Sequence, residues 1–328
     1  MNVQIKGMGH ALPNQVLSNS DLEKMVDTSD EWIIERTGIK ERRIAEPEKL
    51  TSDFCYEAAV MALDNAQITP EQLDLIIVAT VTGDMLFPAT SCVLQERLGA
   101  WNAAAFDLGA GCTGFIYGLV TAQKFLLTPE YNNILVVGGE ILSRIVDYED
   151  RNTCVLFGDG AGAAVLSRGN PPGGIIATSL QADGRGGKWL YIPGGGAAFP
   201  ASEQTLRERM HYIKMKGSEV FRFASKVMVD VSERLLQQAG LGYNDIDFFV
   251  PHQANLRIIK SAMRYMNIPE EKVFINLDRC GNMSAASIPV ALSMAEAEGR
   301  LKPGDLVLTV GFGAGLTSGG AIIRWGGN

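Results

Sequence analysis

The stretch ALDNAQITPEQLDLIIVAT, residues 62–80, has a counterpart later in the same chain. It aligns with LLQQAGLGYNDIDFFVPHQ, residues 235–253, at an offset of 173 residues, and both read as helix, turn and apolar strand. Three identical pairs fall into register: Leu63 and Leu236, Ala66 and Ala239, and Asp74 and Asp247. A second pair, NILVVGG (133–139) and DLVLTVG (305–311), has an offset of 172. Two matches in the same order at nearly one offset indicate a duplicated chain.

Short apolar strands alternate with helical patterns along the whole chain. We expect strands at 3–9, 73–80, 103–108, 133–140, 161–168, 174–183, 246–252, 273–277, 305–312 and 319–325. We expect helices at 51–66, 89–98, 113–128, 217–239, 254–266 and 284–299. This alternation predicts an α/β fold with parallel sheets buried on both faces. The Pro- and Gly-rich stretch RGNPPGG (168–174) marks the expected boundary between two halves, residues 1–170 and 171–328.

Composition excludes several classes of protein. The net charge is −8 without a continuous basic tract, which argues against nucleic-acid binding. No apolar run reaches the roughly 20 residues that span a bilayer, so we expect no membrane partner. The N-terminus, MNVQIKGMGHALP, reads as a first strand rather than a secretory signal.

The five cysteines are scattered, odd in number and without a CxxC pair. This spacing argues against a disulfide framework or a zinc site and favours a reducing, cytoplasmic location without a bound metal. Cys55, Cys92 and Cys154 lie in apolar surroundings, and we expect them in the core.

Cys112 differs from the other cysteines. In FDLGAGCTGF (106–115) it follows a strand, precedes a helix and is surrounded by small residues. A thiol at a helix N-terminus meets the positive end of the helix dipole and free N–H groups, which favour the nucleophilic thiolate. The glycine-rich turn GFGAGLTSGG (311–320) can aim backbone N–H groups at a developing oxyanion, although a tight hairpin alone would explain its glycines.

Two further residues occupy similar corners. His252 ends an apolar strand and begins a helix, and Asn282 lies between a strand and a helix in NLDRCGNMSAAS (276–287). If the halves are related by a pseudo-twofold axis, the corners of Cys112 and Asn282 face each other, with His252 beside them. Cys, His and Asn together suit acyl-transfer chemistry. A histidine that only caps a buried strand remains the alternative for His252.

The helix expected at 254–266 carries a basic stripe. Arg257, Lys260 and Arg264 fall at i, i+3 and i+7, on one face, whereas the apolar residues fall on the other. Arg222 can add to the stripe from a neighbouring segment. In an acidic protein such a stripe suits an acidic partner, and a solvated helix face is the alternative.

Five motifs in order make the sequence resemble the β-ketoacyl-acyl-carrier-protein synthase III family of the thiolase-like superfamily. They are TSDEWIIERTGIKERRIA (28–45), GAGCTGF (109–115), VPHQANLRII (250–259), GNMSAASIP (281–289) and GFGAGLT (311–317), and the resemblance covers essentially the whole chain. It implies the layered αβαβα thiolase fold, with the nucleophilic cysteine in the first half and the His and Asn in the second.

The resemblance also implies roles for individual residues. Cys112 would carry the acyl group, and His252 and Asn282 would bind the extender's thioester carbonyl, with an oxyanion hole from the N–H groups of Cys112 and Ala314. The residues implied in coenzyme A binding are Thr28, Trp32, Arg36, Arg151 and Asn255. Phe87 would reach the partner subunit's acyl pocket in a homodimer. The residues expected to bind acyl carrier protein (ACP) are Arg222, Arg257, Lys260 and Arg264.

The implied reaction is a decarboxylative Claisen condensation that starts type II fatty acid synthesis. An acyl-CoA primer, with acetyl-CoA preferred, and malonyl-ACP would give 3-oxoacyl-ACP, CoA and CO2 through an acyl-cysteine, with acyl-CoA a substrate and no cofactor. The alternatives are a condensing enzyme of secondary metabolism on the same fold and a non-catalytic acyl-CoA-binding protein. Three departures from the family pattern, at Asn152, Cys280 and Ser318, bear on the choice of primer.

Overall fold

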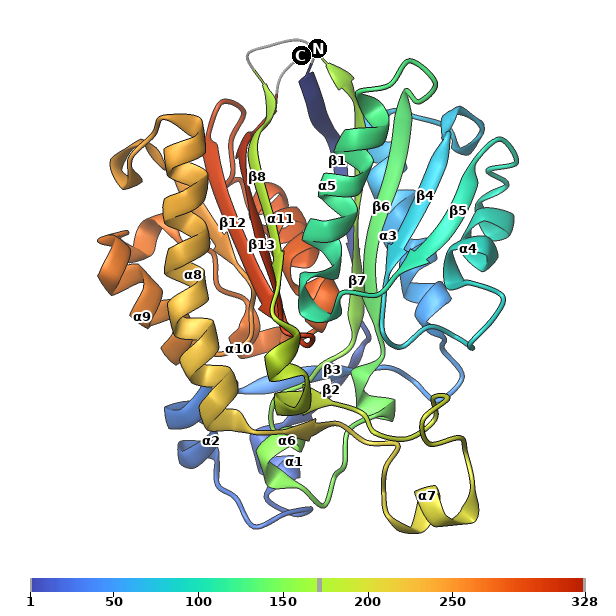
Figure 1. The fold of residues 1–328 in the computed structure, drawn as a ribbon, viewed down its shortest axis with the longest axis vertical. Coiled ribbons are helices and arrows are strands. Elements are labelled where there is room, and N and C mark those ends of the chain that lie inside the picture. Colours follow the sequence, from blue (N-terminus) through green and yellow to red (C-terminus); the bar gives the residue numbers. More distant parts are fainter. Residues whose placement is uncertain (1, 170–172, 327–328) are drawn as a thin grey trace.

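The computed structural model describes residues 2–169 and 173–326. Two sheets stand side by side, each formed by one part of the chain (Figure 1). The first has the order β1-β7-β6-β4-β5, with β1 (Asn2–Ala11), β4 (Leu75–Ala79), β5 (Ala104–Leu108), β6 (Asn133–Glu140) and β7 (Gly160–Gly169). The second has the order β11-β12-β13-β8, with β8 (Gly174–Ala182), β11 (Phe248–Pro251), β12 (Leu306–Gly313) and β13 (Thr317–Arg324).

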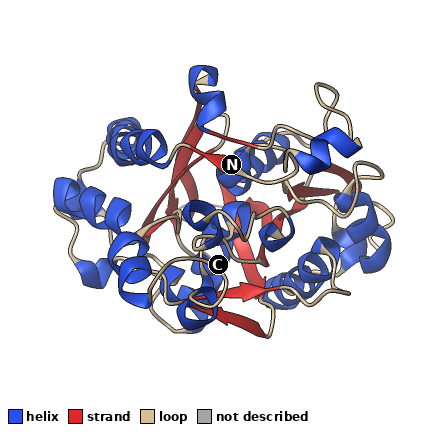
Figure 2. Ribbon diagram, turned by 90° about the horizontal axis from the view of Figure 1, so that it is seen from below, coloured by secondary structure: helices blue, strands red, loops and turns tan. Residues whose placement is uncertain are grey.

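Helices form three layers around these sheets. The outer layers are α3 (Thr51–Ala66) with α4 (Thr90–Leu98) on the first sheet, and α8 (Gly217–Ala239) with α9 (Leu256–Met266) on the second. Between the sheets lie α5 (Gly114–Leu126) and α11 (Ser287–Ala297) (Figure 1). Figure 2 shows the same layers from below. The expected αβαβα arrangement is therefore confirmed, and the predicted bounds of α3 and α8 match the structure. The expectation of parallel sheets is wrong: both sheets are mixed, because β7 and β13 each run antiparallel to both of their neighbours.

The two sequence matches align equivalent elements. β4 pairs in parallel with β6, as β11 does with β12, and an antiparallel strand follows in each sheet. The matched aspartates also act alike: Asp74 accepts a hydrogen bond from the N–H of Asn133 (3.0 Å), and Asp247 accepts one from Leu306 (2.9 Å). Each carboxylate thus ties its strand to the start of the neighbouring parallel strand. The predicted boundary between residues 170 and 171 lies outside the described residues.

A smaller set of elements lies below the sheets in Figure 1. It consists of β2 (Gln15–Ser18), α1 (Asn19–Leu22), α2 (Asp30–Thr37), β3 (Glu41–Ile44), α6 (Arg151–Cys154), β9 (Leu190–Tyr191), α7 (Glu203–Arg207), β10 (Lys214–Met215) and α10 (Leu277–Cys280). The fully buried Arg42 of β3 joins parts of this set, because its guanidinium donates to the carbonyls of Leu17 and Val155 and to the Asn19 side chain.

Seven short 3₁₀ turns complete the described elements. They are η1 (Pro70–Gln72), η2 (Gly111–Thr113), η3 (Leu142–Arg144), η4 (Gly184–Trp189), η5 (Tyr243–Asp245), η6 (Glu270–Lys272) and η7 (Ser284–Ala286). η2 and η7 lead directly into the two central helices, α5 and α11.

The strand expected at 273–277 is wrong. The segment makes only an isolated bridge between Val273 and Phe249 before turning into α10. The buried Gln253 side chain takes the place of a neighbouring strand, since it donates to the carbonyl of Phe274 (3.1 Å) and accepts from the N–H of Asn276 (3.1 Å).

One expected core cysteine is also wrong. Cys55 and Cys154 are buried, but Cys92 is exposed. Thr90, Ser91 and Leu94 form the buried face of α4, and the helical turn places Cys92 away from them. All five cysteines are free thiols.

None of the described helices is long and apolar enough to cross a membrane.

Candidate active site

A cavity of about 1100 Å³ joins the three predicted catalytic side chains to the protein surface. Cys112, His252 and Asn282 line its inner end and are 8%, 1% and 7% exposed. Its outer end, the mouth, is lined by more accessible residues, among them Trp32 and Arg36. The fold therefore brings together three residues that are far apart in the sequence, and it leads a channel to them.

Cys112 lies in η2, directly before α5. Gly111, beside Cys112, and Gly313, at the start of the β12–β13 turn, let the backbone of that turn pack closely against η2. A Cβ on Gly313 would lie 2.6 Å from the backbone nitrogen of Cys112, and a Cβ on Gly111 would lie 3.1 Å from that of Ala314. Gly111 also has φ +54°, the left-handed region that favours glycine. Small residues around the thiol are thus a requirement of close backbone packing.

Burial has the largest effect on the thiol. It raises the pKa of Cys112 to about 11, and the nearby carboxylate of Glu140 acts in the same direction. Hydrogen bonding by the Ser284 side chain and by the backbones of Cys112 and Ala314 lowers the pKa, but by less. Burial of Cys112 therefore opposes the thiolate that the helix terminus is expected to favour.

The backbone groups of Cys112 and Ala314 that act on the thiol are also the two groups expected to form the oxyanion hole. The backbones of Cys112 and Ala314 both act on the Cys112 sulfur. The Thr317 hydroxyl lies 3.0 Å from the carbonyls of Ala110 and Ala314 and so links the two corners. The two backbone groups expected to form the oxyanion hole therefore both lie near the Cys112 thiol.

His252 follows β11, where its N–H donates to the carbonyl of Val310 (2.8 Å). Its ring packs edge-on against Phe312, with centroids 5.2 Å apart, and its Nδ1 lies 2.5 Å from the hydroxyl of Ser287. Burial lowers the pKa of His252 to about 3, so the imidazole is neutral at neutral pH. With Nδ1 held by Ser287, Nε2 is the nitrogen left to bind a substrate atom.

Asn282 is oriented by its own backbone turn. Its Oδ1 accepts a hydrogen bond from the N–H of Ser284 (2.9 Å), so the amide Nδ2 is left as a donor. Backbone hydrogen bonds to Leu156 and Gly158 hold the residue against the β6–β7 connection. The side chain thus lines the cavity with a donor group beside the neutral His252.

Most of the predicted coenzyme A residues gather at the mouth. Trp32 and Arg36 are one helical turn apart on α2, and the Arg36 guanidinium lies 5.8 Å from the indole centroid. Arg151 approaches the same ring to 5.0 Å and donates to the carbonyl of Asp27 (2.7 Å). Two cations therefore flank one tryptophan.

Thr28 and Asn255 take different places. Thr28 is half-buried, its hydroxyl has no hydrogen-bond partner among the described residues, and it is absent from the described residues that line the cavity. Asn255 lines the cavity, but its amide is already used: Nδ2 donates to the carbonyl of Arg36 (2.9 Å), and Oδ1 caps α9. It fastens α2 to α9.

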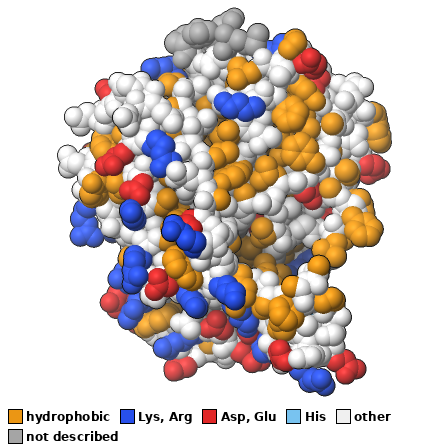
Figure 3. Space-filling view, viewed as in Figure 1, with side chains coloured by type: hydrophobic (Ala, Val, Ile, Leu, Met, Phe, Trp, Pro, Cys, Tyr) orange, Lys and Arg blue, Asp and Glu red, His pale blue; other side chains and the backbone are white. Residues whose placement is uncertain are grey.

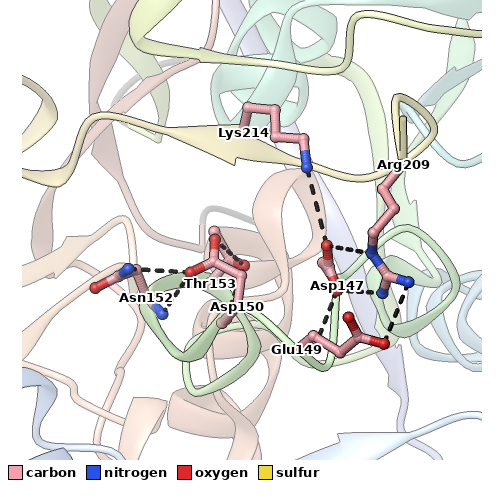
Figure 4. A network of polar contacts seen from close by, with 7 residues as sticks. All are labelled: Asp147, Glu149, Asp150, Asn152, Thr153, Arg209 and Lys214. Atoms are coloured by element: carbon pink, nitrogen blue, oxygen red, sulfur yellow. Dashed lines mark hydrogen bonds and ion pairs between the residues drawn. The ribbon is translucent and has the colours of Figure 1, made fainter. Parts of the chain in front are cut away.

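A polar network holds the segment that carries Arg151 and Asn152 (Figure 4). Asp147 accepts two hydrogen bonds from Arg209, which also pairs with Glu149 (3.3 Å). Lys214 lies 3.9 Å from Asp147. The Arg209 guanidinium holds the pKa of the Asp147 carboxyl below its usual range, so the network stays ionised at neutral pH. Next to it, the Asp150 side chain accepts from the backbone of Asn152, which lines the cavity.

The predicted ACP-binding residues lie beside the mouth. Arg257, Lys260 and Arg264 are exposed on α9, and none of them takes part in an ion pair between described residues. Arg257 lines the cavity and stacks over the ring of Phe221 (5.4 Å). Arg222 also lines the cavity and pairs with Glu219. Lys and Arg side chains gather on this side of the molecule, at the left of Figure 3.

Phe87 lies elsewhere. It is 83% exposed, next to Leu86, which is 90% exposed, and Met85, which is 52% exposed. It is not among the described residues that line this chain's own cavity.

The described residues contain no cluster of three His, Cys, Asp or Glu side chains that could hold a metal ion.

Four residues of the site were missed from the sequence. Ser284 acts on the pKa of Cys112 and its N–H donates to Asn282, while the hydroxyl of Ser287 lies against His252. Phe312 packs on the ring of His252, and the carboxylate of Glu140 raises the pKa of Cys112. The serines belong to a quoted motif but look like ordinary small residues. Glu140 offered a signal, because it is a lone acidic residue that ends the otherwise apolar strand NILVVGGE (133–140).

Comparisons with known proteins agree with this geometry. Two family models match: 3-oxoacyl-[acyl-carrier-protein] synthase III over residues 106–184, and its C-terminal part over residues 236–325. A beta-ketoacyl-[acyl-carrier-protein] synthase III of Syntrophomonas wolfei is 63% identical over 326 residues, which cover 99% of this chain and 98% of that protein.

Solved structures give the same picture. The synthase III of Aquifex aeolicus superposes with a TM-score of 0.92 at 46% identity, covering 98% of this chain and 100% of the other. The priming beta-ketosynthase of the R1128 polyketide pathway has a TM-score of 0.92 at 35% identity, covering 99% and 96%. On this evidence the chain belongs to the 3-oxoacyl-[acyl-carrier-protein] synthase III family.

Proposed function

We propose that this chain catalyses the decarboxylative condensation of an acyl-CoA primer, acetyl-CoA in the first instance, with malonyl-ACP. The products are 3-oxoacyl-ACP, CoA and CO2, and the reaction starts type II fatty acid synthesis. The carrying observation is that Cys112, His252 and Asn282 share the inner end of one cavity whose mouth holds Trp32 and Arg36. Full-length relatives that are named as synthase III enzymes support the same reaction.

In the first half-reaction Cys112 attacks the acyl-CoA carbonyl, and CoA leaves. The cavity would hold the pantetheine arm, while Trp32, Arg36 and Arg151 would hold the nucleotide end, with Thr28 and Asn255 as supporting positions. The N–H groups of Cys112 and Ala314 would stabilise the oxyanion of the tetrahedral intermediate.

In the second half-reaction malonyl-ACP enters the same cavity. The neutral His252 and the Asn282 amide donate hydrogen bonds to its thioester oxygen, which stabilises the enolate formed as CO2 leaves. The enolate carbon then attacks the acyl carbon on Cys112, the bond from that carbon to the cysteine sulfur breaks, and the released thiolate takes up a proton from solvent before the next turnover. His252 acts here as a neutral donor and takes no proton, as its lowered pKa requires. Every step uses side chains and backbone groups of this chain together with its substrates, without a cofactor.

Three further elements complete the proposal. Arg222, Arg257, Lys260 and Arg264 would dock the acidic ACP beside the mouth. The chain would act as a homodimer in which Phe87 contributes to the partner's acyl pocket. The enzyme would work in the cytoplasm, where free thiols persist and its substrates are made.

Mass spectrometry of the intact enzyme tests the reaction. Incubation with acetyl-CoA should add one acetyl group to the wild type and none to Cys112→Ala, and malonyl-ACP should then remove the label as 3-oxoacyl-ACP. His252→Ala and Asn282→Ala should still become acetylated but lose condensation by about 10²–10³-fold. Full labelling of Cys112→Ala would assign the nucleophile elsewhere, and a wild type that binds acyl-CoA without any covalent label would be a binding protein.

A condensing enzyme of secondary metabolism is the second candidate, favoured by the similarity to the R1128 priming ketosynthase. A panel of acyl-CoAs of increasing length, each followed by malonyl-ACP, separates the two. Preference for acetyl-CoA supports fatty acid initiation, whereas preference for a longer primer supports the second candidate.

A further inference from the structure

The segment that leads to Arg151 is held by an ion pair that the proposed reaction does not use (Figure 4). Arg209, which follows α7, places its guanidinium on both carboxylate oxygens of Asp147: Nε lies 3.0 Å from Oδ2, and Nη2 lies 2.5 Å from Oδ1. The Asp147 side chain is only 7% exposed. A single ion pair at the surface contributes little, but a forked arginine on a nearly buried carboxylate fixes the geometry of both groups.

Two further contacts fasten the same pair of segments together. Lys214 of β10 lies 3.9 Å from Asp147, and the N–H of Ile213 donates to the carbonyl of Ile145 (2.9 Å). Arg209 itself has φ +52°, a left-handed conformation that is uncommon outside glycine and persists only where surrounding contacts hold it. The chain between α7 and β10 is therefore tied at several points to the segment that precedes α6.

Asp147 in turn shapes the backbone that leads into α6. Its Oδ1 accepts from the N–H of Glu149 (3.0 Å), and its carbonyl accepts from the N–H of Asp150 (3.0 Å). Asp150 then caps α6, because its side chain accepts from the N–H of Asn152 (3.0 Å). Arg151 is the first residue of this short helix. The place of Arg151 thus depends on the turn that Asp147 holds.

The Arg151 side chain has few restraints of its own. It is 45% exposed, donates to the carbonyl of Asp27 (2.7 Å) and lies 5.0 Å from the ring centroid of Trp32. The Asp27 carboxylate, 3.8 Å away, is fully exposed. A long and exposed side chain loses rotamer freedom when it binds a ligand, so a fixed backbone beneath it lowers the cost of binding.

We propose that the pair of Arg209 and Asp147 positions Arg151 for the nucleotide end of CoA, an inference that rests on the proposed function. Arg209 and Asp147 are not among the described residues that line the cavity, so they act without touching the ligand. The effect passes through the turn and the cap of α6 to Arg151. Arg209 is thus a positioning residue, and its loss should weaken the binding of CoA without slowing the chemistry at Cys112.

Arg209→Ala tests the inference by isothermal titration calorimetry with CoA. The Kd for CoA should rise about tenfold, since residues of one hydrogen-bonded network are energetically coupled. The kcat with saturating acetyl-CoA should change little, and so should the KM for acetyl-pantetheine, which lacks the nucleotide. Asp147→Asn keeps the size and an oxygen that can accept from Glu149. It should weaken CoA binding similarly and serves as the second variant, should Arg209→Ala fail to fold.

A double-mutant cycle with Arg151→Ala shows whether Arg209 acts through Arg151. In the Arg151→Ala background, Arg209→Ala should cause little further loss of CoA affinity, because the side chain that it positions is already gone. An equal loss in both backgrounds would mean that the ion pair supports the fold in general, and it would overturn the inference.

Arg185→Ala is the matched control. Arg185 also places a forked guanidinium on a neighbouring carboxylate, that of Asp183 (2.8 and 2.6 Å), and it is not among the described residues that line the cavity. This variant should bind CoA as the wild type does, and a tenfold loss in it would count against a specific role of Arg209.

The same titrations separate this inference from the proposed function. A wild type that does not bind CoA would overturn the proposed function, and the inference with it. A wild type that binds CoA, together with an Arg209→Ala variant of the same Kd, would overturn the positioning role alone.

Discussion

The chemistry of single residues in this site is set mainly by burial. Cys112 and His252 are ionisable side chains that burial drives toward their neutral forms, with pKa values of about 11 and about 3. The neutral imidazole suits a hydrogen-bond donor to an enolate, whereas burial opposes the thiolate form of Cys112.

Ser287 is the residue that sets which nitrogen of His252 carries the proton. Its single hydroxyl proton has two acceptors in reach, His252 Nδ1 (2.5 Å) and the carbonyl of Ser284 (2.9 Å). The proposed mechanism uses the form in which Ser287 donates to Nδ1 and the proton lies on Nε2, whereas donation to the Ser284 carbonyl instead puts the proton on Nδ1. Ser287→Ala should therefore slow decarboxylation of malonyl-ACP, by up to about 10²-fold, with little change in Cys112 acetylation.

Ser293→Ala is a matched control for this variant, since Ser293 lies on the same helix and contacts Nδ1 of His10 (2.9 Å). The pH dependence gives a second check. A raised pH cannot deprotonate a histidine that is already neutral, so wild-type decarboxylation should not change with an apparent pKa near 6.5 between pH 5 and 8. Such a change would show that His252 titrates in the working enzyme and would contradict the assigned role.

At the scale of elements, α2 and α9 form the mouth together. Asn255 at the start of α9 donates to the last turn of α2, and a Cβ on Gly38, which has φ +81°, would lie 2.5 Å from the Leu256 side chain. In our proposal α2 binds acyl-CoA and α9 binds ACP, so substitutions on one helix can test one ligand without altering the other helix.

Trp32→Ala and Arg36→Ala should raise the KM for acyl-CoA by about tenfold, because α2 would lose its stacking surface and its cation. Trp32 is half-buried, so its removal could also loosen α2. Steady-state kinetics and thermal melting, measured on the same samples, distinguish these effects. An unchanged KM with a lower Tm would make Trp32 a packing residue.

Arg257→Glu with Lys260→Glu should raise the KM for malonyl-ACP about tenfold or more and make the remaining rate less sensitive to salt. Acetylation of Cys112 by acetyl-CoA should change little, because that step needs no carrier protein. Lys6→Glu with Lys124→Glu alters the net charge equally at two exposed positions outside the cavity and is the control. Equal losses in both half-reactions would indicate a damaged helix, and no loss in either would remove α9 from the docking surface.

At the scale of the whole molecule, the apolar side chains of Met85, Leu86 and Phe87 are exposed in the single chain. Phe87→Asp should convert the expected dimer into a monomer, because a charge in a buried contact is strongly destabilising. Sedimentation velocity measures the outcome. Trp101→Asp changes another exposed aromatic, 69% accessible, and should leave the dimer intact. A Phe87→Asp dimer of wild-type stability would place the interface elsewhere.

Local patterns predicted most of the fold. The periodicity of 51–66 and 217–239 matched α3 and α8, and Asp74 and Asp247 correctly marked equivalent corners of the two sheets. The short elements around the cavity were missed because four or five residues are too few to show a period. The strand expected at 273–277 was wrong because a distant side chain, Gln253, takes over its backbone hydrogen bonds.

The sequence by itself determined the family, the order of the layers and the three candidate catalytic residues, since each depends on motifs and spacing within short segments. Only the tertiary structure decided how those residues are protonated and which groups surround them. Burial is produced by segments far apart in the chain, so desolvation at Cys112 opposes the thiolate that a terminal dipole favours. For the same reason Glu140, a strand end in the sequence, is buried in the folded protein and its carboxylate acts on the Cys112 thiol.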